Sequence, residues 1–230
     1  MGLREELQTE VAAIFKARWS ERDGYVVPGD DGLKLGNDAV SVDATVLYAD
    51  MADSTMLVEQ QTATFAAEIY KTFLHCAAKI IRDEGGVVTA YDGDRVMAVY
   101  MGNSKNTSAV RTALKLHWAV ARIIAPAMKE QYHQQNYVMQ HVVGIDTSKI
   151  LVARTGVRGA NDLVWVGRAA NYAAKLATLA HDNATYITQE VYDATHLSMK
   201  TSEGNQMWVA RSWTAMNNLR IYSSNYWQSF

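Results

Sequence analysis

The stretch from Gly85 to Met101 constrains the fold most strongly, because it carries a helix stop and a hairpin in sequence. A helical pattern over 55–84 ends at Gly85-Gly86, a common C-terminal stop signal. Two strand-like runs follow, at 87–91 and 96–101, and the turn between them is Asp92-Gly93-Asp94. This stretch predicts a helix followed directly by a β-hairpin.

The segments around this hairpin also alternate between strand-like and helix-like patterns. We predict a strand over 44–49, a helix over 106–130 whose last turns Pro126 perturbs, and strands over 137–145 and 149–155. The order β-α-β-β-α-β is typical of a ferredoxin-like core, so we predict an α+β fold with an antiparallel sheet. Beyond the core we expect further elements: a helix over 168–180, a short strand over 185–187, a helix over 188–195, and antiparallel strands in the tail around Trp208, Trp213 and Ile221-Tyr222.

The first 39 residues differ from the rest. Residues 3–19 have apolar side chains at helical spacing, and a loop over 28–32 follows them. We therefore divide the chain into an N-terminal helical arm (1–39) and a single domain (40–230). The arm would pack on its own domain or on a partner subunit.

Composition excludes several classes of protein. The net charge is −2 and the pI about 6.3, so we expect no nucleic-acid partner. No apolar run approaches the ~20 residues of a membrane span, and the start lacks the apolar region of a signal peptide, so we expect a cytoplasmic protein without membrane contact. Cys76 is the single cysteine, which rules out an intrachain disulfide and fits a buried thiol.

Two acidic residues stand beside predicted strands. Asp50 ends the strand that precedes the 55–84 helix, and Asp94 lies in the hairpin turn. Two carboxylates that converge there would bind hard divalent cations, which usually serve phosphate chemistry. The backbone N–H groups after Met51 would meet a triphosphate at a helix N-terminus. The structural alternatives are an N-cap for Asp50 and ordinary turn chemistry for Asp94.

A second polar pair lies on the predicted 168–180 helix. Asn171 and Lys175 are four residues apart and share one helix face. An amide and a cation placed in this way could orient a ribose and stabilise a charged transition state. The alternative is a solvated polar face.

Four motifs, in this order, resemble those of the class III nucleotidyl cyclases, the catalytic domains of adenylate and guanylate cyclases. They are residues 48–55, residues 93–99, Gly144 to Ser148 (with Ser148 where the family has glycine), and the stretch from Val166 to Lys175. The resemblance covers about residues 42–195, with gaps.

The resemblance implies a role for each matching residue. Asp50 and Asp94 would hold two divalent metal ions, Mn²⁺ or Mg²⁺, with the Met51 carbonyl as a further ligand. The phosphates would bind to the backbone of Ala52, Asp53, Ser54 and Thr55. Asn171 would orient the ribose, and Lys175 would take the transition-state role that the family usually gives to arginine.

The resemblance also implies a homodimer, because in this family each active site combines the metal half of one subunit with the Asn/Arg half of the other. The ribose 3′-hydroxyl would attack the α-phosphate, giving a 3′,5′-cyclic nucleotide and pyrophosphate. A cation that meets the triphosphate usually lies near the last strands. Arg211 and Arg220 are candidates by position, but neither fits the usual spacing well.

Two positions depart from the family pattern. Ala90 stands where adenylate cyclases carry the adenine-reading lysine, and Val164 stands where its partner is found. Both have lost hydrogen-bonding groups, so the site does not read a purine in the usual way. The chain therefore resembles the stand-alone pyrimidine cyclases of bacterial Pycsar antiphage systems, which make cyclic UMP or cyclic CMP for a separate effector. Tyr91, Trp165 or Arg168 would fill or contact the base site.

Other readings stay open at this stage. The chain could be an adenylate or guanylate cyclase with atypical base recognition. It could be a degenerate domain that only binds nucleotide or dimerises. A diguanylate-cyclase or polymerase-palm relative is disfavoured, because Asp92 to Arg95 lacks the acidic and aromatic residues of that hairpin.

Overall fold

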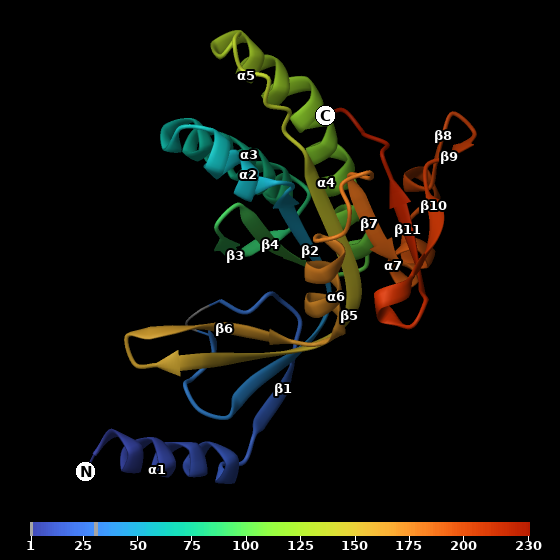
Figure 1. The fold of residues 1–230 in the computed structure, drawn as a ribbon. Coiled ribbons are helices and arrows are strands. Elements are labelled where there is room, and N and C mark those ends of the chain that lie inside the picture. The colour runs from blue at the N-terminus through green and yellow to red at the C-terminus, as the bar shows by residue number, and fades with distance from the viewer. Residues whose placement is uncertain (1, 30–31) are drawn as a thin grey trace.

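The computed structural model describes residues 2–29 and 32–230, so Met1 and the predicted loop residues Asp30 and Asp31 lie outside the described residues. Within these ranges nine strands form one sheet (Figure 1). Its main path runs β10-β11-β7-β5-β2-β4-β3, while β1 pairs with β2 and β6 pairs with β5. The bounds are β1 Ser20–Gly24, β2 Asp38–Met51, β3 Val87–Asp92, β4 Arg95–Tyr100, β5 His141–Val157, β6 Ala160–Val166, β7 Thr185–Thr188, β10 Val209–Trp213 and β11 Leu219–Ser224. A separate two-stranded sheet pairs β8 Thr201–Ser202 with β9 Asn205–Gln206.

The predicted core order is confirmed. β2, α3 (Ala63–Asp83), β3, β4, α4 (Lys105–Ala119) and β5 follow one another along the chain. Their strands lie in the order β5-β2-β4-β3, which places the first strand between the last strand and the second half of the hairpin. This is the ferredoxin-like arrangement, and the tail strands β10 and β11 are antiparallel as predicted.

The single helix predicted over 55–84 is wrong, because the structure has two. α2 (Ser54–Gln60) ends before α3 begins at Ala63. Thr62 is the N-cap of α3, and its hydroxyl accepts a hydrogen bond from the Phe65 N–H at 3.3 Å. A threonine cap satisfies one of the free amides of a new helix, so the chain restarts there rather than continuing α2.

The two strands predicted over 137–145 and 149–155 are one strand, β5, which starts only at His141. The polar residues at 146–148 suggested a break, yet each of them is paired with β2. Thr147 donates from Oγ1 to the Ala44 carbonyl at 3.2 Å, so its polar group is satisfied within the strand. β6, which the sequence reasoning missed, pairs with the far end of β5 as a long hairpin.

The helix predicted over 106–130 is interrupted near Pro126, as expected. A π-helical turn over Val120–Ile124 separates α4 from α5 (Ala125–Gln131). Proline lacks the N–H that a regular helix would use, and the wider π turn accommodates that loss. The remaining helices are α6 (Arg168–Leu176), shorter than predicted, and α7 (Gln189–Ala194).

The N-terminal arm is joined to the sheet through β1 and through residues 33–35, where Arg154 of β5 donates to the Leu33 carbonyl at 3.2 Å and Leu35 forms a bridge with Arg154. α1 (Leu3–Lys16) buries none of its side chains, and Figure 1 shows it apart from the sheet, beyond the β5–β6 hairpin. β1 pairs in parallel with the start of β2, from Ser20 opposite Asp38 to Gly24 opposite Val42. The division at residue 39 stays a prediction. No helix in the described part of the chain is long and apolar enough to cross a bilayer.

The two faces of β2 bury different clusters, because successive side chains point to opposite sides. Leu47, Ala49 and Met51 join the large core that packs against α3 and α4. The alternate residues, including Val42 and Val46, pack on the other face with alanines of α6. Asp50 continues this second series, so its carboxylate lies on the α6 face of the sheet.

Candidate active site

Direct pairing of β2 with β4 brings Asp50 and Asp94 together. Ala49 of β2 lies opposite Val96 of β4 in an antiparallel register. Asp50 is the next residue along β2, and Asp94 lies two residues before Val96. The two carboxylates therefore stand at the same end of adjacent strands.

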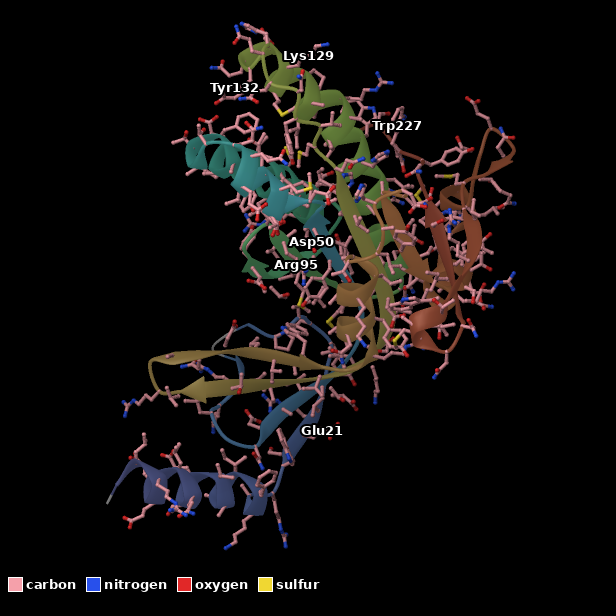
Figure 2. All side chains as sticks on the ribbon, viewed as in Figure 1. Glu21, Asp50, Arg95, Lys129, Tyr132 and Trp227 are labelled. Atoms are coloured by element: carbon pink, nitrogen blue, oxygen red, sulfur yellow. The ribbon has the colours of Figure 1, made fainter. Side chains whose placement is uncertain are left out.

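Asp50 is largely buried, with a side chain 13% exposed. The Arg95 guanidinium donates from Nη2 to Oδ2 of Asp50 at 2.7 Å, and Figure 2 shows the two side chains side by side. Burial raises the pKa of Asp50, and the nearby negative charges of Asp94 and Asp92 add to this, whereas Arg95 opposes it. The Asp50 carboxylate thus needs a positive partner in order to stay ionised at low cost.

The donor set fits Mg²⁺ or Mn²⁺. Two carboxylates and the backbone carbonyl of Met51 are hard oxygen donors of the kind that these ions prefer. Among the residues that the structure describes, no group of three or more His, Cys, Asp or Glu side chains is gathered for a metal. Mg²⁺ usually takes one or two protein carboxylates and completes its shell with phosphate and water.

The segment from Ala52 to Thr55 turns from β2 into α2. The Ala52 N–H donates to the Gln140 carbonyl at 3.0 Å, so that amide is already used. Asp53 has a left-handed backbone (φ 55°) at the N-cap position, but its side chain makes no capping bond. Its carboxylate lies 3.6 Å from Nε2 of His181 instead. The amides of Ser54 and Thr55 are first-turn amides, which lack a partner within the helix.

Asn171 and Lys175 share an exposed face of α6. Ala169 and Ala173 of α6 pack in the apolar cluster on this face of the sheet. Asn171 lies two residues from each of them, and two residues correspond to a rotation of about 200° around a helix. The Asn171 side chain therefore points away from that cluster. Its Nδ2 donates to the Gly167 carbonyl at 3.3 Å. Lys175 Nζ lies 3.8 Å from the sulfur of Met216. Both polar groups therefore remain available to a ligand or a second molecule.

The G-I-x-x segment of β5 holds α6 in place. A Cβ on Gly144 would lie 2.2 Å from the Ala173 carbonyl oxygen and 2.5 Å from the Ala177 nitrogen, so only glycine permits this approach. Ser148, which replaces a family glycine, accepts a hydrogen bond from the Ala169 N–H at 3.0 Å. It therefore binds the first turn of α6.

Lys175 reaches toward a different part of the sheet from the strands that carry the two carboxylates. Lys175 contacts Met216, which lies in the turn just before β11. In the sheet, β7 and β5 separate β11 from β2, the strand that carries Asp50. Tyr172 of α6 packs edge-on against Trp213 of β10, which also directs this side of the helix toward the β10–β11 edge.

The two positions expected to read the base have different surroundings. Ala90 on β3 is partly buried against the same apolar cluster as Leu163 and Trp165 of β6. Val164, the alternate residue on β6, is 38% exposed. Tyr91 is exposed as well. The position that carries a purine-reading lysine in adenylate cyclases is thus part of an apolar surface.

Arg168 is engaged elsewhere, contrary to the suggestion that it contacts a base. Its Nε lies 3.1 Å from Oδ2 of the fully buried Asp146, and its Nη2 donates to the Thr147 carbonyl at 2.9 Å. It also pairs with Glu190. Burial raises the pKa of Asp146, and Thr188 donates to it at 2.6 Å. This network fixes the start of α6 to β5, and sequence reasoning missed it.

The two arginines near the last strands also have partners. Arg211 donates from Nε to the Ser223 hydroxyl at 2.8 Å, and Arg220 lies over the Tyr222 ring at 5.8 Å. Both belong to the β10–β11 edge of the sheet, away from β2. Sequence reasoning instead missed Arg95, although its place directly after Asp94 was a usable signal.

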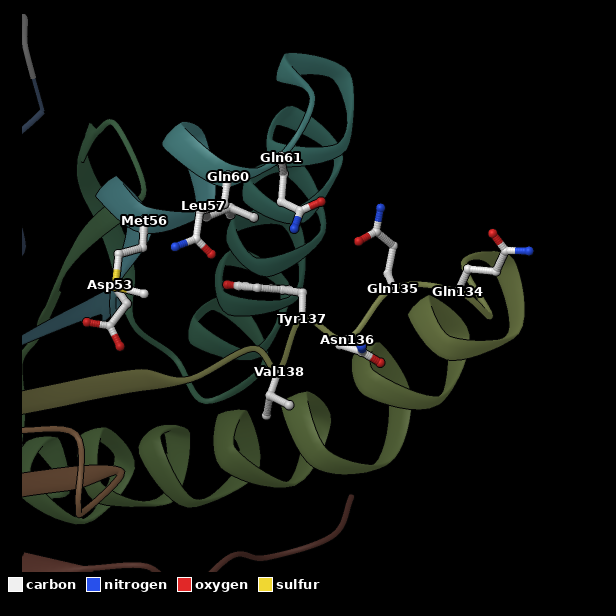
Figure 3. A pocket seen from close by; sticks show the side chains of 10 residues that line it. All are labelled: Asp53, Met56, Leu57, Gln60, Gln61, Gln134, Gln135, Asn136, Tyr137 and Val138. Atoms are coloured by element: carbon white, nitrogen blue, oxygen red, sulfur yellow. The ribbon is translucent and has the colours of Figure 1, made fainter.

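A cavity of about 420 Å³ lies beside α2, between that helix and residues 134–138 (Figure 3). Its lining is rich in amides from Gln60, Gln61, Gln134, Gln135 and Asn136. The hydroxyl of Tyr137 is buried there without a hydrogen-bond partner, and burial raises the pKa of Tyr137 to about 12. Asp53 lines this cavity, whereas Asp50 and Asp94 lie outside it.

The family model for the adenylate and guanylate cyclase catalytic domain matches residues 39–222. The chain is 52% identical to a protein from Xanthomonas perforans, over 98% of both chains, and 51% identical to one from Burkholderia cepacia, over 94% of both. Both relatives are named uridylate cyclase.

Solved structures give the same fold. A bacterial light-regulated adenylyl cyclase superposes with a TM-score of 0.67 at 18% identity, over 84% of this chain and 53% of that one. The adenylyl cyclase CyaB from P. aeruginosa superposes with a TM-score of 0.64 at 19% identity, over 81% of this chain and 95% of that one.

Proposed function

The chain belongs to the family of adenylate and guanylate cyclase catalytic domains, and we propose that this nucleotide cyclase converts UTP to 3′,5′-cyclic UMP and pyrophosphate. The observation that carries the proposal is the 52% identity, over 98% of both chains, to a protein named uridylate cyclase. CTP is the second candidate substrate, because it shares the pyrimidine ring.

The surroundings of Ala90 support a pyrimidine. A lysine or another hydrogen-bonding side chain there would read a purine edge, but a methyl group cannot. Ala90 shares its apolar cluster with Trp165, a large ring from the neighbouring hairpin. Trp165 is a candidate to occupy space that a smaller base leaves, and Tyr91, exposed next to Ala90, is another.

The proposed mechanism uses the residues described above. Asp50, Asp94 and the Met51 carbonyl would hold two divalent ions, which supply charge neutralisation at the phosphates when bound. The amides of Ser54 and Thr55 would bind phosphate oxygens.

Asn171 would orient the ribose so that its 3′-oxygen meets the α-phosphorus. The 3′-hydroxyl would lose its proton to solvent as a new O–P bond forms, and the bond to pyrophosphate would break. The ammonium group of Lys175 would stabilise the negative charge that develops at the α-phosphate.

We also propose a homodimer with two intersubunit sites. The support is the separation of the two halves within one chain: the carboxylates stand on β2 and β4, while Lys175 leans toward the β10–β11 edge. A second copy with twofold symmetry could supply the missing half to each site.

A mixing experiment tests the homodimer. Asp50→Asn and Lys175→Ala proteins should each be inactive, yet a 1:1 mixture that exchanges subunits should regain about a quarter of wild-type activity, because half of the dimers then carry one intact site of two. A mixture that stays inactive after exchange would contradict intersubunit sites.

The proposal also includes a cellular role for the product. Resemblance to Pycsar cyclases suggests a cytoplasmic enzyme whose cyclic pyrimidine nucleotide is a second messenger in bacterial antiviral defence, read by a separate effector. An effector gene beside the cyclase gene would support this extension.

A turnover assay tests the substrate. Purified protein with Mn²⁺ is incubated separately with UTP, CTP, ATP and GTP, and the products are separated by chromatography against cyclic nucleotide standards. We expect cyclic UMP as the main product, and none from the Asp50→Asn variant. Turnover of ATP or GTP alone would indicate a purine cyclase with atypical base recognition. Nucleotide binding without turnover would indicate a degenerate binding or dimerisation module.

A further inference from the structure

Arg95 is the cation that the described structure places on the metal-site carboxylate. It follows Asp94 directly and donates to Asp50 at 2.7 Å. Its own side chain is 29% exposed, and the negative charges of Asp92 and Asp94 lie close enough to raise its pKa further. One guanidinium therefore stands among three carboxylates at the end of the β2–β4 pair and offsets only part of their charge.

The position of the guanidinium matters because it uses Oδ2, one of the two oxygens of the carboxylate that would hold the two ions. A bound Mg²⁺ or Mn²⁺ accepts lone pairs from carboxylate oxygens, and Arg95 donates a proton to Oδ2 of the same carboxylate. Two positive centres on one small, largely buried carboxylate also repel each other strongly. The ion pair and the metal are therefore competing states of Asp50.

Among the described residues Arg95 is the only cation bonded to Asp50, so its removal leaves the metal-free carboxylate without one. A buried carboxylate that loses its partner destabilises the folded protein. Arg95 thus stabilises the metal-free state, and this stabilisation is given up when the metal arrives.

We propose that Arg95 is a built-in counter-ion of the metal site, which occupies Asp50 in the metal-free enzyme and must be displaced before metal binds. The inference rests on the proposed metal role of Asp50. It makes Arg95 a positioning residue that sets the metal concentration at which the site fills. The ring of Tyr48, 6.0 Å from the guanidinium carbon, is one surface beside which the displaced side chain can lie.

The test measures metal binding without nucleotide. Free Mn²⁺ is followed by electron paramagnetic resonance during titration into wild type, Arg95→Gln and Arg95→Lys at pH 8. We expect Arg95→Gln to bind Mn²⁺ roughly tenfold more tightly than wild type, with Arg95→Lys between the two. The metal-free Arg95→Gln protein should also melt at a lower temperature, and Mn²⁺ should raise its melting temperature more than it does for wild type.

Two controls separate displacement from a general charge effect. Lys105→Gln removes a cation that is also bonded at 2.7 Å to an aspartate of β2, Asp43, in the middle of that strand, and it should leave Mn²⁺ affinity unchanged. Repeating the titrations in 0.5 M KCl screens through-space effects, whereas the loss of a direct competitor persists.

The possible outcomes are distinct. Unchanged or weaker Mn²⁺ binding in both Arg95 variants, or a gain that disappears in 0.5 M KCl, overturns the inference. If Asp50→Asn binds Mn²⁺ as tightly as wild type, the metal role of Asp50 in the proposed function fails instead. Should Arg95→Gln not fold, the Arg95→Lys affinity and melting shift decide the question.

Discussion

The contact between Gly144 and α6 gives the sharpest prediction for a single substitution. In Gly144→Ala the new methyl carbon would lie 2.2 Å from the Ala173 carbonyl oxygen, 2.5 Å from the Ala177 nitrogen and 2.7 Å from the Leu176 Cβ. Two of these three atoms belong to the helix backbone, so no side-chain rotation relieves the overlap. α6 must move away from β5.

The expected loss of stability follows from the kind of clash. Added carbon in a packed core costs about 1–3 kcal/mol, and a clash with backbone belongs at the upper end. For a chain of this length, about 3 kcal/mol corresponds to a fall of roughly 6–12 °C in melting temperature. Because α6 carries Asn171 and Lys175, a shift of about 1 Å would lower the cyclase turnover rate by roughly 100-fold.

Urea and thermal unfolding measure the stability, and product formation under saturating nucleotide measures the rate. Gly29→Ala is the matched control, because a Cβ at Gly29 meets no atom of the described residues within 4 Å, and its effect should stay within about 0.5 kcal/mol. Wild-type stability and turnover in Gly144→Ala would refute the argument that glycine is required here for helix packing.

Three further predictions follow from the site and its supports. Arg168→Ala leaves Asp146 buried without its ion-pair partner, so the free energy of unfolding should fall by about 3 kcal/mol in urea titrations at pH 8, and Asp146→Asn in the same chain should recover part of the loss. His141 is fully buried, which lowers its pKa from 6.5 to about 3, so only the unfolded chain takes up its proton between these values. The free energy of unfolding therefore falls as the pH drops below 6.5, by about 1.4 kcal/mol at pH 5.5. His141→Gln should flatten the pH dependence of the unfolding free energy measured in urea. An unchanged pH dependence would contradict this role of His141. Lys175→Ala should lower turnover by roughly 100- to 1,000-fold while Lys175→Arg retains it, and an Ala variant as active as wild type would remove Lys175 from the mechanism.

Local sequence patterns predicted the core because hairpins and helix stops are short-range signals. The turn at Asp92-Gly93-Asp94 and the stop at Gly85-Gly86 both lie where expected. The break between α2 and α3 was missed because Thr62 caps a helix within an otherwise helical pattern. The continuity of β5 was missed because pairing with β2, which is far away in sequence, satisfies its polar residues.

The candidate site was also predictable from the sequence only in part. The pairing of β2 with β4 follows from the fold, so the proximity of Asp50 and Asp94 could be expected from the sequence. The partners of the charged side chains could not be expected from the sequence. Arg95 and Arg168 each bind an aspartate at least 20 residues away, and only tertiary structure reveals such pairs.

The length of β2 has a consequence for how this chain can vary. Its 14 residues span about 46 Å, from the pairing with β1 at one end to Asp50 at the other. An insertion or deletion of one residue between Val42 and Asp50 would turn every later side chain to the opposite face, moving Asp50 into the core that α3 and α4 cover. The length of this strand can therefore change by two residues while Asp50 stays on the α6 face of the sheet, but it cannot change by one.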